Sequence, residues 1–206
     1  ELIEDREPIE DRELIDGLEP IDRKAKTPLV PHGVLGMLLF VLTEIMVFAG
    51  LISAFTIAKA SAPVWPPPGQ PRLPVEATAF NSLILLASGV ALLFAHRAFH
   101  RGDRAGMLKP MWLALGLGGT FVIIQGYEWV SLISEGLTMM SSSYGAFFYL
   151  IVGIHALHAF AAIGMLAIAT NRLQSGWLTP GFFGATEIFW FFVVGVWPVL
   201  YVVVYL

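Results

Sequence analysis

The chain has 206 residues, of which 56 % are hydrophobic and 14 % are charged, and its net charge is −4. Soluble domains are about 45–50 % apolar and about 25 % charged, so this composition places the chain among membrane proteins. The lack of cysteine excludes disulfides, thiolate metal sites and thioether attachment of haem.

The first 30 residues differ in character from the rest. Residues 1–26 carry ten acidic and five basic residues, and they repeat every six positions as ELIEDR, EPIEDR, ELIDGL and EPIDRK. Two prolines and one aliphatic pair per repeat argue against an amphipathic helix, so we predict an extended, cytoplasmic N-terminal arm over residues 1–30. It is either a solvated, disordered tail or an arm laid over a partner subunit. In the second case the partner contacts are Ile3, Ile9, Ile15 and Ile21.

Five apolar stretches follow, each long enough to cross a hydrocarbon core of about 30 Å as a helix. They predict an all-α integral membrane bundle of five transmembrane helices within residues 31–206. Their continuous apolar character disfavours a β-barrel, whose strands alternate with a period of two. The predicted spans are Val34–Ala58, Ala77–Ala95, Met111–Ile133, Tyr144–Thr170 and Ile188–Leu206.

The charges between the spans predict their orientation. Eight basic residues lie on the N-terminal side: Arg23, Lys24, Lys26, Arg97, Arg101, Arg104, Lys109 and Arg172. Only Lys59 and Arg72 lie on the other side. The positive-inside rule therefore places the N-terminus in the cytoplasm and the C-terminus across the membrane. Beyond setting topology, Arg97, Arg101, Arg104 and Lys109 are candidates for contact with anionic lipid headgroups.

Glu44 is the only charged residue of the first span and lies close to its middle. A carboxylate at that depth costs several kcal/mol, so we expect Glu44 to be protonated and hydrogen-bonded inside the bundle. No lysine or arginine on any span can pair with it. An acid within the membrane is a candidate functional group, and whether Glu44 also serves function stays open.

His155 and His158 are three residues apart, so they share one face of the fourth span. Di-iron bundles need Glu-x-x-His on two helices and two further glutamates, and the spans lack that pattern. We therefore expect hydrogen-bonded structural histidines and no metal ligands. Gln125 and Glu128 lie toward the far end of the third span, where Glu128 is either an interfacial anchor or a functional group.

In order, these segments resemble cytochrome c oxidase subunit III and its relatives in bacterial quinol oxidases. The resemblance runs from about Gly36 to Leu206. It rests on GMLLFVLTEIMVFAG around Glu44, WPPPG at 65–69, NSLILLASG at 81–89, the Gln-x-x-Glu-aromatic motif at 125–129, and GAFFYLIVGIHALH at 145–158.

Two departures from the family pattern stand out. The family often carries two helices ahead of the glutamate helix, and here the repeat tail takes their place, as in a shorter five-helix form. In the last helix the family usually reads Trp-His-Phe-Val-Asp, but this chain has Phe191 and Val194 at the histidine and aspartate positions. The polar network of the relatives is therefore absent here or rebuilt around Glu187, one turn earlier.

The resemblance implies a non-catalytic subunit III of a haem–copper terminal oxidase in a bacterial plasma membrane. Such a subunit binds no haem or copper, since both lie in the partner part of the complex, and it assembles with the catalytic subunit I and with subunit II. It holds structural phospholipid and supports assembly and proton uptake. Buried polar groups for this cleft would be Glu44, Gln125, Glu128, His155 and His158. The alternatives are an accessory subunit of a nitric oxide reductase complex, or a proton or ion carrier that uses Glu44 directly.

Overall fold

A computed structural model describes residues 31–206, and the predicted N-terminal arm with its four isoleucines lies outside this range. Five helices run up and down alternately: α2 (His32–Ser61), α3 (Val75–His100), α4 (Arg104–Ser134), α5 (Ser143–Gln174) and α6 (Pro180–Leu200). The chain ends in a π-helical turn, η1 (Tyr201–Tyr205). All five helices are long and apolar enough to cross a membrane, which confirms the predicted all-helical, five-span architecture.

The helix ends follow from local sequence. Side chains of Asp103, Ser142 and Thr179 accept hydrogen bonds from backbone N–H groups in the first turns of α4, α5 and α6. Gly102 follows the end of α3 and has φ of +72°, a conformation that costs glycine little because it has no Cβ. Helices α4, α5 and α6 begin ahead of the predicted spans because these capping residues, and not the first apolar residues, set where they start.

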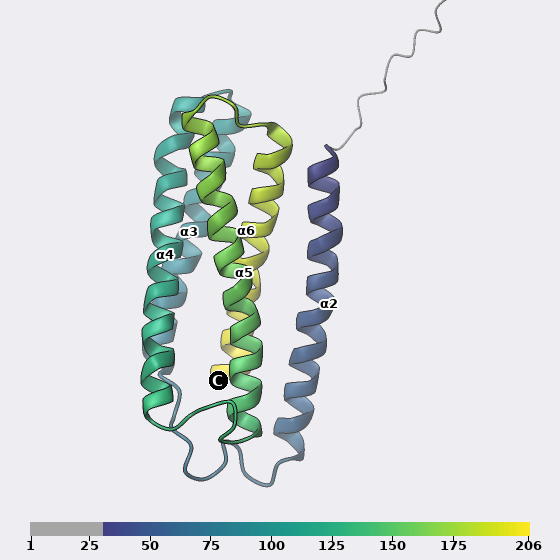
Figure 1. Ribbon diagram of the computed structural model, residues 1–206, viewed down its shortest axis with the longest axis vertical. Coiled ribbons are helices and arrows are strands. Elements are labelled where there is room, and N and C mark those ends of the chain that lie inside the picture. Colours follow the sequence, from purple (N-terminus) through teal and green to yellow (C-terminus); the bar gives the residue numbers. More distant parts are fainter. Residues whose placement is uncertain (1–30) are drawn as a thin grey trace, which may run out of the picture.

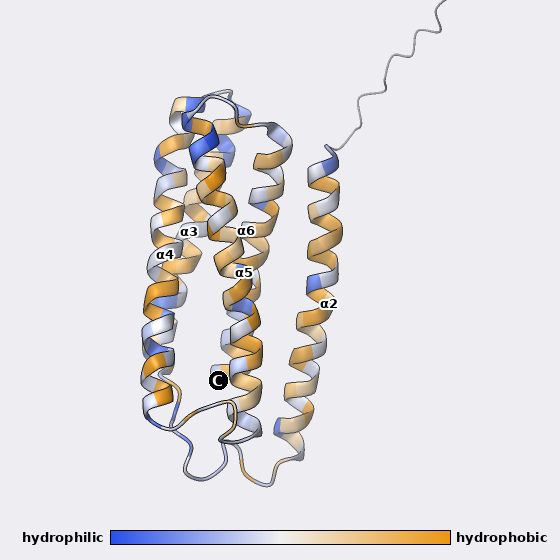
Figure 2. Cartoon of the chain, viewed as in Figure 1, coloured by the Kyte–Doolittle hydropathy of each residue, from blue (hydrophilic) through white to orange (hydrophobic). Residues whose placement is uncertain are grey.

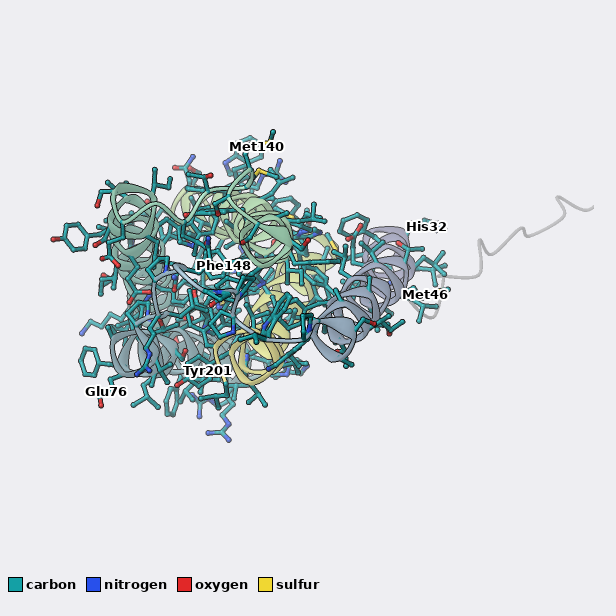
Figure 3. The ribbon with its side chains drawn as sticks, turned by 90° about the horizontal axis from the view of Figure 1, so that it is seen from below. His32, Met46, Glu76, Met140, Phe148 and Tyr201 are labelled. Atoms are coloured by element: carbon teal, nitrogen blue, oxygen red, sulfur yellow. The ribbon has the colours of Figure 1, made fainter. Side chains whose placement is uncertain are left out.

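Four helices form a packed group, and α2 stands at its edge (Figure 1). Helix α3 packs most extensively against α4, while α2 lies mainly against α6 and touches α5 less. Only Phe48 and Phe55 of α2 are buried. Viewed along the helices, Phe148 lies inside the bundle whereas Met46 lies on the outer side of α2 (Figure 3). Helix α2 therefore presents a wide apolar surface to its surroundings.

The surface of the spans is mostly hydrophobic, with hydrophilic residues gathered at the ends (Figure 2). A hydrophilic position interrupts the hydrophobic surface of α2 partway along its length (Figure 2). Between α2 and α3, the proline-rich loop folds back onto the bundle. Its Trp65 meets Phe55 of α2 and Tyr144 of α5, with ring centroids 5.6 and 5.4 Å apart.

Candidate functional site

A hydrogen bond joins the first and fourth spans near mid-membrane. The Nε2 atom of His158 on α5 lies 3.0 Å from Oε2 of Glu44 on α2, and the two side chains are only 11 % and 18 % exposed. Glu44 lies twelve residues, or about 18 Å, from the start of α2. The expected hydrogen bond to Glu44 inside the bundle is therefore present, and its partner is a histidine.

The second nitrogen of His158 determines how the pair shares its protons. Nδ1 lies 2.8 Å from the carbonyl oxygen of Ile154. A carbonyl oxygen only accepts, so Nδ1 carries a hydrogen. The contact between Nε2 and Glu44 then holds one further proton, on either the carboxyl or the imidazole. In both arrangements the pair is neutral overall, which explains how an acid is accommodated without lysine or arginine.

Phenylalanines surround the pair. Phe40 and Phe48 lie one turn before and one turn after Glu44 on α2, and their ring centroids are 6.3 and 5.5 Å from that of His158. Phe189 and Phe192 of α6 lie 6.1 and 6.0 Å from it. Residues four apart share a helix face, so one face of α2 brings the carboxyl and its apolar cover to α5 and α6 together.

His155 does not take part in this pair, although it lies only three residues away. Its side chain is 2 % exposed, and its ring meets that of Trp197 on α6 with centroids 5.0 Å apart. Neither ring nitrogen has a hydrogen-bond partner among residues 31–206. The expectation of hydrogen-bonded histidines therefore fits His158, whereas His155 has no partner within the described chain.

A second polar cluster joins α3, α4 and η1. Gln125 Nε2 donates to Glu128 Oε2 at 2.9 Å and lies 3.1 Å from the Tyr205 hydroxyl. Asn81 Nδ2 is 3.4 Å from Gln125 Oε1, and the Thr78 hydroxyl is 2.9 Å from Glu128 Oε2. Glu128 is 7 % exposed. It is therefore a buried member of a network and not an anchor that reaches the surface.

Three members of this cluster, Thr78, Asn81 and Tyr205, were not singled out from the sequence. Thr78 and Asn81 are polar residues three apart in an apolar span, a spacing that places both on one helix face. That signal was available. Tyr205 depends on the π-helical turn, which widens the backbone after Pro198 and brings the tyrosine to Gln125, and no sequence pattern indicates it.

In α6, apolar side chains occupy the two positions where the family pattern has histidine and aspartate, Phe191 and Val194. Val194 packs against Gly89, where a Cβ atom would lie 3.1 Å from its Cγ1. Glu187 instead meets His96 of α3, with Nδ1 3.0 and 3.1 Å from the two carboxyl oxygens. Helix α6 therefore has a polar contact at Glu187, near the end of the bundle where α2 begins.

The four basic residues of the α3–α4 connection are exposed: Arg97, Arg101, Arg104 and Lys109. Arg104 Nη1 donates to the carbonyl oxygen of Gly176 at 3.1 Å and so ties this connection to the loop after α5. The other three make no salt bridge within residues 31–206. They leave positive charge at the end of the bundle where α2 begins.

Within the part of the chain that the structure describes, no three His, Cys, Asp or Glu side chains gather closely enough to hold a metal ion. His155 and His158 face different neighbours, and Glu44 reaches only His158. The arrangement can hold helices together, share a proton and bind lipid at its apolar surfaces.

The chain matches known proteins along most of its length. The family model described as cytochrome c oxidase subunit III matches residues 21–206. Cytochrome c oxidase subunit 3 of Halichoerus grypus is 35 % identical over 193 residues, covering 87 % of this chain and 71 % of the relative. Those of Synechocystis sp. and Bos taurus are 33 % and 35 % identical, again over 87 % of this chain, and over 81 % and 71 % of their own lengths.

Proposed function

The chain belongs to the cytochrome c oxidase subunit III family, and from this premise we propose a specific role for it within a haem–copper terminal oxidase. It is a non-catalytic subunit that flanks the catalytic subunit I, contacts subunit II, and supports assembly and proton uptake. Haem and copper belong to the partner subunits. The observation that carries this role is the hydrogen bond between Glu44 and His158, which joins two of the motifs that carry the family resemblance.

The Glu44–His158 pair holds α2 against the rest of the bundle. Because only two α2 side chains are buried, a polar contact within the phenylalanine enclosure contributes a large share of what fixes this helix. A pair that shares one proton can also relay protons and stay neutral overall, provided that it takes up one proton as it releases another. We assign the pair to the support of proton uptake and Gln125 and Glu128 to the second polar cluster that fixes α3 to α4.

Phospholipid is the second element of the proposal. Helix α2 stands at the edge of the bundle and its outer side chains are exposed, for example Met46 at 69 % and Leu39 at 58 %. Acyl chains fit such a surface, while Arg97, Arg101, Arg104 and Lys109 suit anionic headgroups at the same end as the start of α2. We propose that the N-terminal end lies in the cytoplasm of a bacterial cell, as the positive-inside rule favours.

The family match favours an oxidase subunit over the two alternatives. A nitric oxide reductase accessory subunit and a carrier that uses Glu44 directly both leave the matches to cytochrome c oxidase subunit 3 proteins unexplained. Glu44 is also already bonded to His158, so it is not a free carboxyl in an open path.

Co-purification tests the proposal. The tagged full chain, extracted from its native membrane in a mild detergent, should bring with it a chain with the haem–copper spectrum. The isolated chain should show no Soret band. Oxygen consumption of the complex should persist longer during turnover than that of the complex stripped of this subunit. A Soret band from the chain alone, or equal lifetimes with and without it, would overturn the role.

A further inference from the structure

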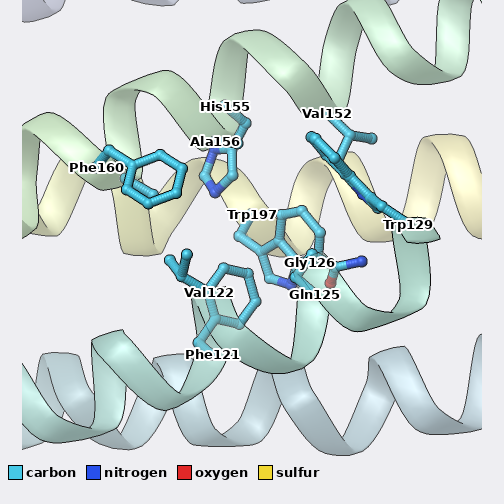
Figure 4. A pocket seen from close by; sticks show the side chains of 11 residues that line it. Phe121, Val122, Gln125, Gly126, Trp129, Val152, His155, Ala156, Phe160 and Trp197 are labelled. Atoms are coloured by element: carbon cyan, nitrogen blue, oxygen red, sulfur yellow. The ribbon is translucent and has the colours of Figure 1, made fainter.

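A cavity of about 140 Å³ lies between α4, α5 and α6 (Figure 4). Its walls are mainly apolar and aromatic, and none of the side chains around it is an acid, lysine or arginine. Principal wall residues are Phe121, Gln125, Trp129, His155, Ala159 and Trp197. An engineered apolar cavity of about 150 Å³ holds one benzene molecule. This cavity therefore has room for one six-membered ring.

One polar side chain enters the cavity without a partner. The imidazole of His155 projects from α5 toward the space between Phe160, Val122 and Trp197 (Figure 4). It is 2 % exposed, and neither nitrogen is hydrogen-bonded within residues 31–206. A neutral imidazole offers one donor and one acceptor. Buried polar groups generally find partners, so an occupant that presents an oxygen here would satisfy His155.

Other polar atoms around the cavity are mostly occupied already. Trp197 Nε1 donates to the Ser82 hydroxyl at 2.7 Å, and Gln125 Nε2 is engaged with Glu128 and Tyr205. Trp129 also lines the cavity, and its Nε1 has no partner in the described part of the chain. The free hydrogen-bonding capacity is therefore that of one imidazole and one indole N–H, within apolar walls.

The cavity is reached from the hydrocarbon. Its rim includes Phe160 of α5, which is 61 % exposed, and Gly126 of α4, which is exposed and has no side chain to close the opening. His155 lies twelve residues from the start of α5, or about 18 Å from that end of the helix, so the rim faces acyl chains and not the aqueous phase. An occupant must therefore dissolve in the membrane, and the uncharged walls disfavour an ionised one.

We propose that this cavity binds the ring of a phenol- or quinone-type molecule from the bilayer, with a ring oxygen hydrogen-bonded to His155. The cavity is large enough for one such ring, the unpartnered imidazole can form a hydrogen bond to its oxygen, and the rim allows it to enter from the hydrocarbon. A phenol can donate to or accept from His155, and a quinone carbonyl can accept from it. This site lies apart from the Glu44–His158 pair and does not rest on the role proposed for that pair.

Fluorine NMR of the full chain in detergent tests the site with 4-fluorophenol and fluorobenzene as probes. The phenol should bind about fivefold more tightly than fluorobenzene, after subtraction of a detergent blank, because one net hydrogen bond is added. In His155→Phe this preference should disappear while fluorobenzene still binds. In Gly126→Leu both probes should weaken by about tenfold, since the new side chain extends at the rim, where a Cβ meets no atom within 4 Å.

Gly116→Leu is the matched control, because Gly116 is also an exposed α4 glycine with open space at Cβ but does not line the cavity. It should bind both probes as the wild type does. A short-tailed benzoquinone that displaces 4-fluorophenol supports occupancy from the membrane quinone pool, and failure to displace it restricts the site to phenols. Binding of 4-fluorophenol no stronger than to detergent, or binding unchanged in Gly126→Leu, overturns the proposal and leaves water or an acyl chain as the occupant.

Discussion

We predict that Glu44 and His158 stabilise the folded bundle through their hydrogen bond, with a coupling energy of about 1 kcal/mol in a double-mutant cycle. Interhelical hydrogen bonds in membranes average about 0.6 kcal/mol in double-mutant cycles and reach about 1.7. This one has a donor–acceptor distance of 3.0 Å and lies within a phenylalanine enclosure, which places it in the upper half of that range. A coupling of 1 kcal/mol changes the folding equilibrium roughly fivefold.

The cycle consists of Glu44→Ala, His158→Ala and the double variant, with unfolding followed by far-UV circular dichroism in mixed micelles of increasing SDS content. Each single variant leaves the other polar group buried without its partner, at a cost of about 1–3 kcal/mol. The double variant should therefore be more stable than the sum of the two single losses indicates. Coupling below about 0.3 kcal/mol, the level found for independent sites, would refute the reasoning.

Glu44→Gln is the matched variant, since the amide keeps the size of the carboxyl and can donate to Nε2 of His158. It should unfold within about 0.5 kcal/mol of the wild type, because the hydrogen bond is retained. In the complex it should leave assembly intact and at most lower turnover. Loss of all oxygen reduction in an intact Glu44→Gln complex would show that Glu44 lies directly on a proton path.

Three further predictions follow from packing, from the second polar cluster and from the N-terminal sequence. Gly118→Ala should cost about 1–3 kcal/mol in the same SDS assay because its Cβ would lie 2.5 Å from the Trp190 ring, whereas Gly116→Ala, with open space around Cβ, should be neutral or slightly stabilising. Equal stabilities would contradict the packing. Glu128→Leu should destabilise by about 1–3 kcal/mol and Glu128→Gln by less, as measured by thermal unfolding in detergent, since the leucine leaves the polar cluster unsatisfied. Deleting residues 1–24 should weaken retention of the subunit in the complex during purification, and limited proteolysis should cut these residues more slowly in the complex than in the isolated chain; equal rates would favour a free tail.

The sequence predicted the five helices because span length and apolar composition alone decide that feature. Their ends were less accurate. The third span was expected at Met111–Ile133, yet α4 begins at Arg104. Charged residues end an apolar run but not a helix, and the side chain of Asp103, not the last apolar residue, sets where α4 starts.

The site was predictable as a set of residues but not as a set of contacts. His155 and His158 were grouped because three residues on a helix turn through about 300°, which leaves them about 60° apart. That difference is enough for His158 to meet Glu44 on α2 while His155 faces Trp197 and the cavity. Spacing along one helix does not specify which helix lies opposite, and this depends on packing among all five.

Three of the acids in the described helices, Glu44, Glu128 and Glu187, lie at different depths, and each is hydrogen-bonded to a helix other than its own. Glu187 meets His96 near the end where α2 begins, Glu44 meets His158 near the middle, and Glu128 joins Thr78 toward the opposite end. In an apolar medium a helix arrangement that separates such partners leaves a polar group unsatisfied, at a cost of several kcal/mol. Apolar packing, which is similar on many faces of these helices, discriminates less between arrangements.

The hydrogen bonds of these acids therefore mainly determine which helices lie next to one another. The consequence is sharpest for α2, where Phe48 and Phe55 are the only buried side chains and Glu44 makes the only side-chain hydrogen bond to another helix within the described residues. Replacing both members of the pair by alanine removes the contact without leaving either polar group buried and unsatisfied. The double variant should thus keep a folded α3–α6 bundle while the position of α2 becomes less specific, a loss that cross-linking between α2 and α5 would detect before any loss of helix content.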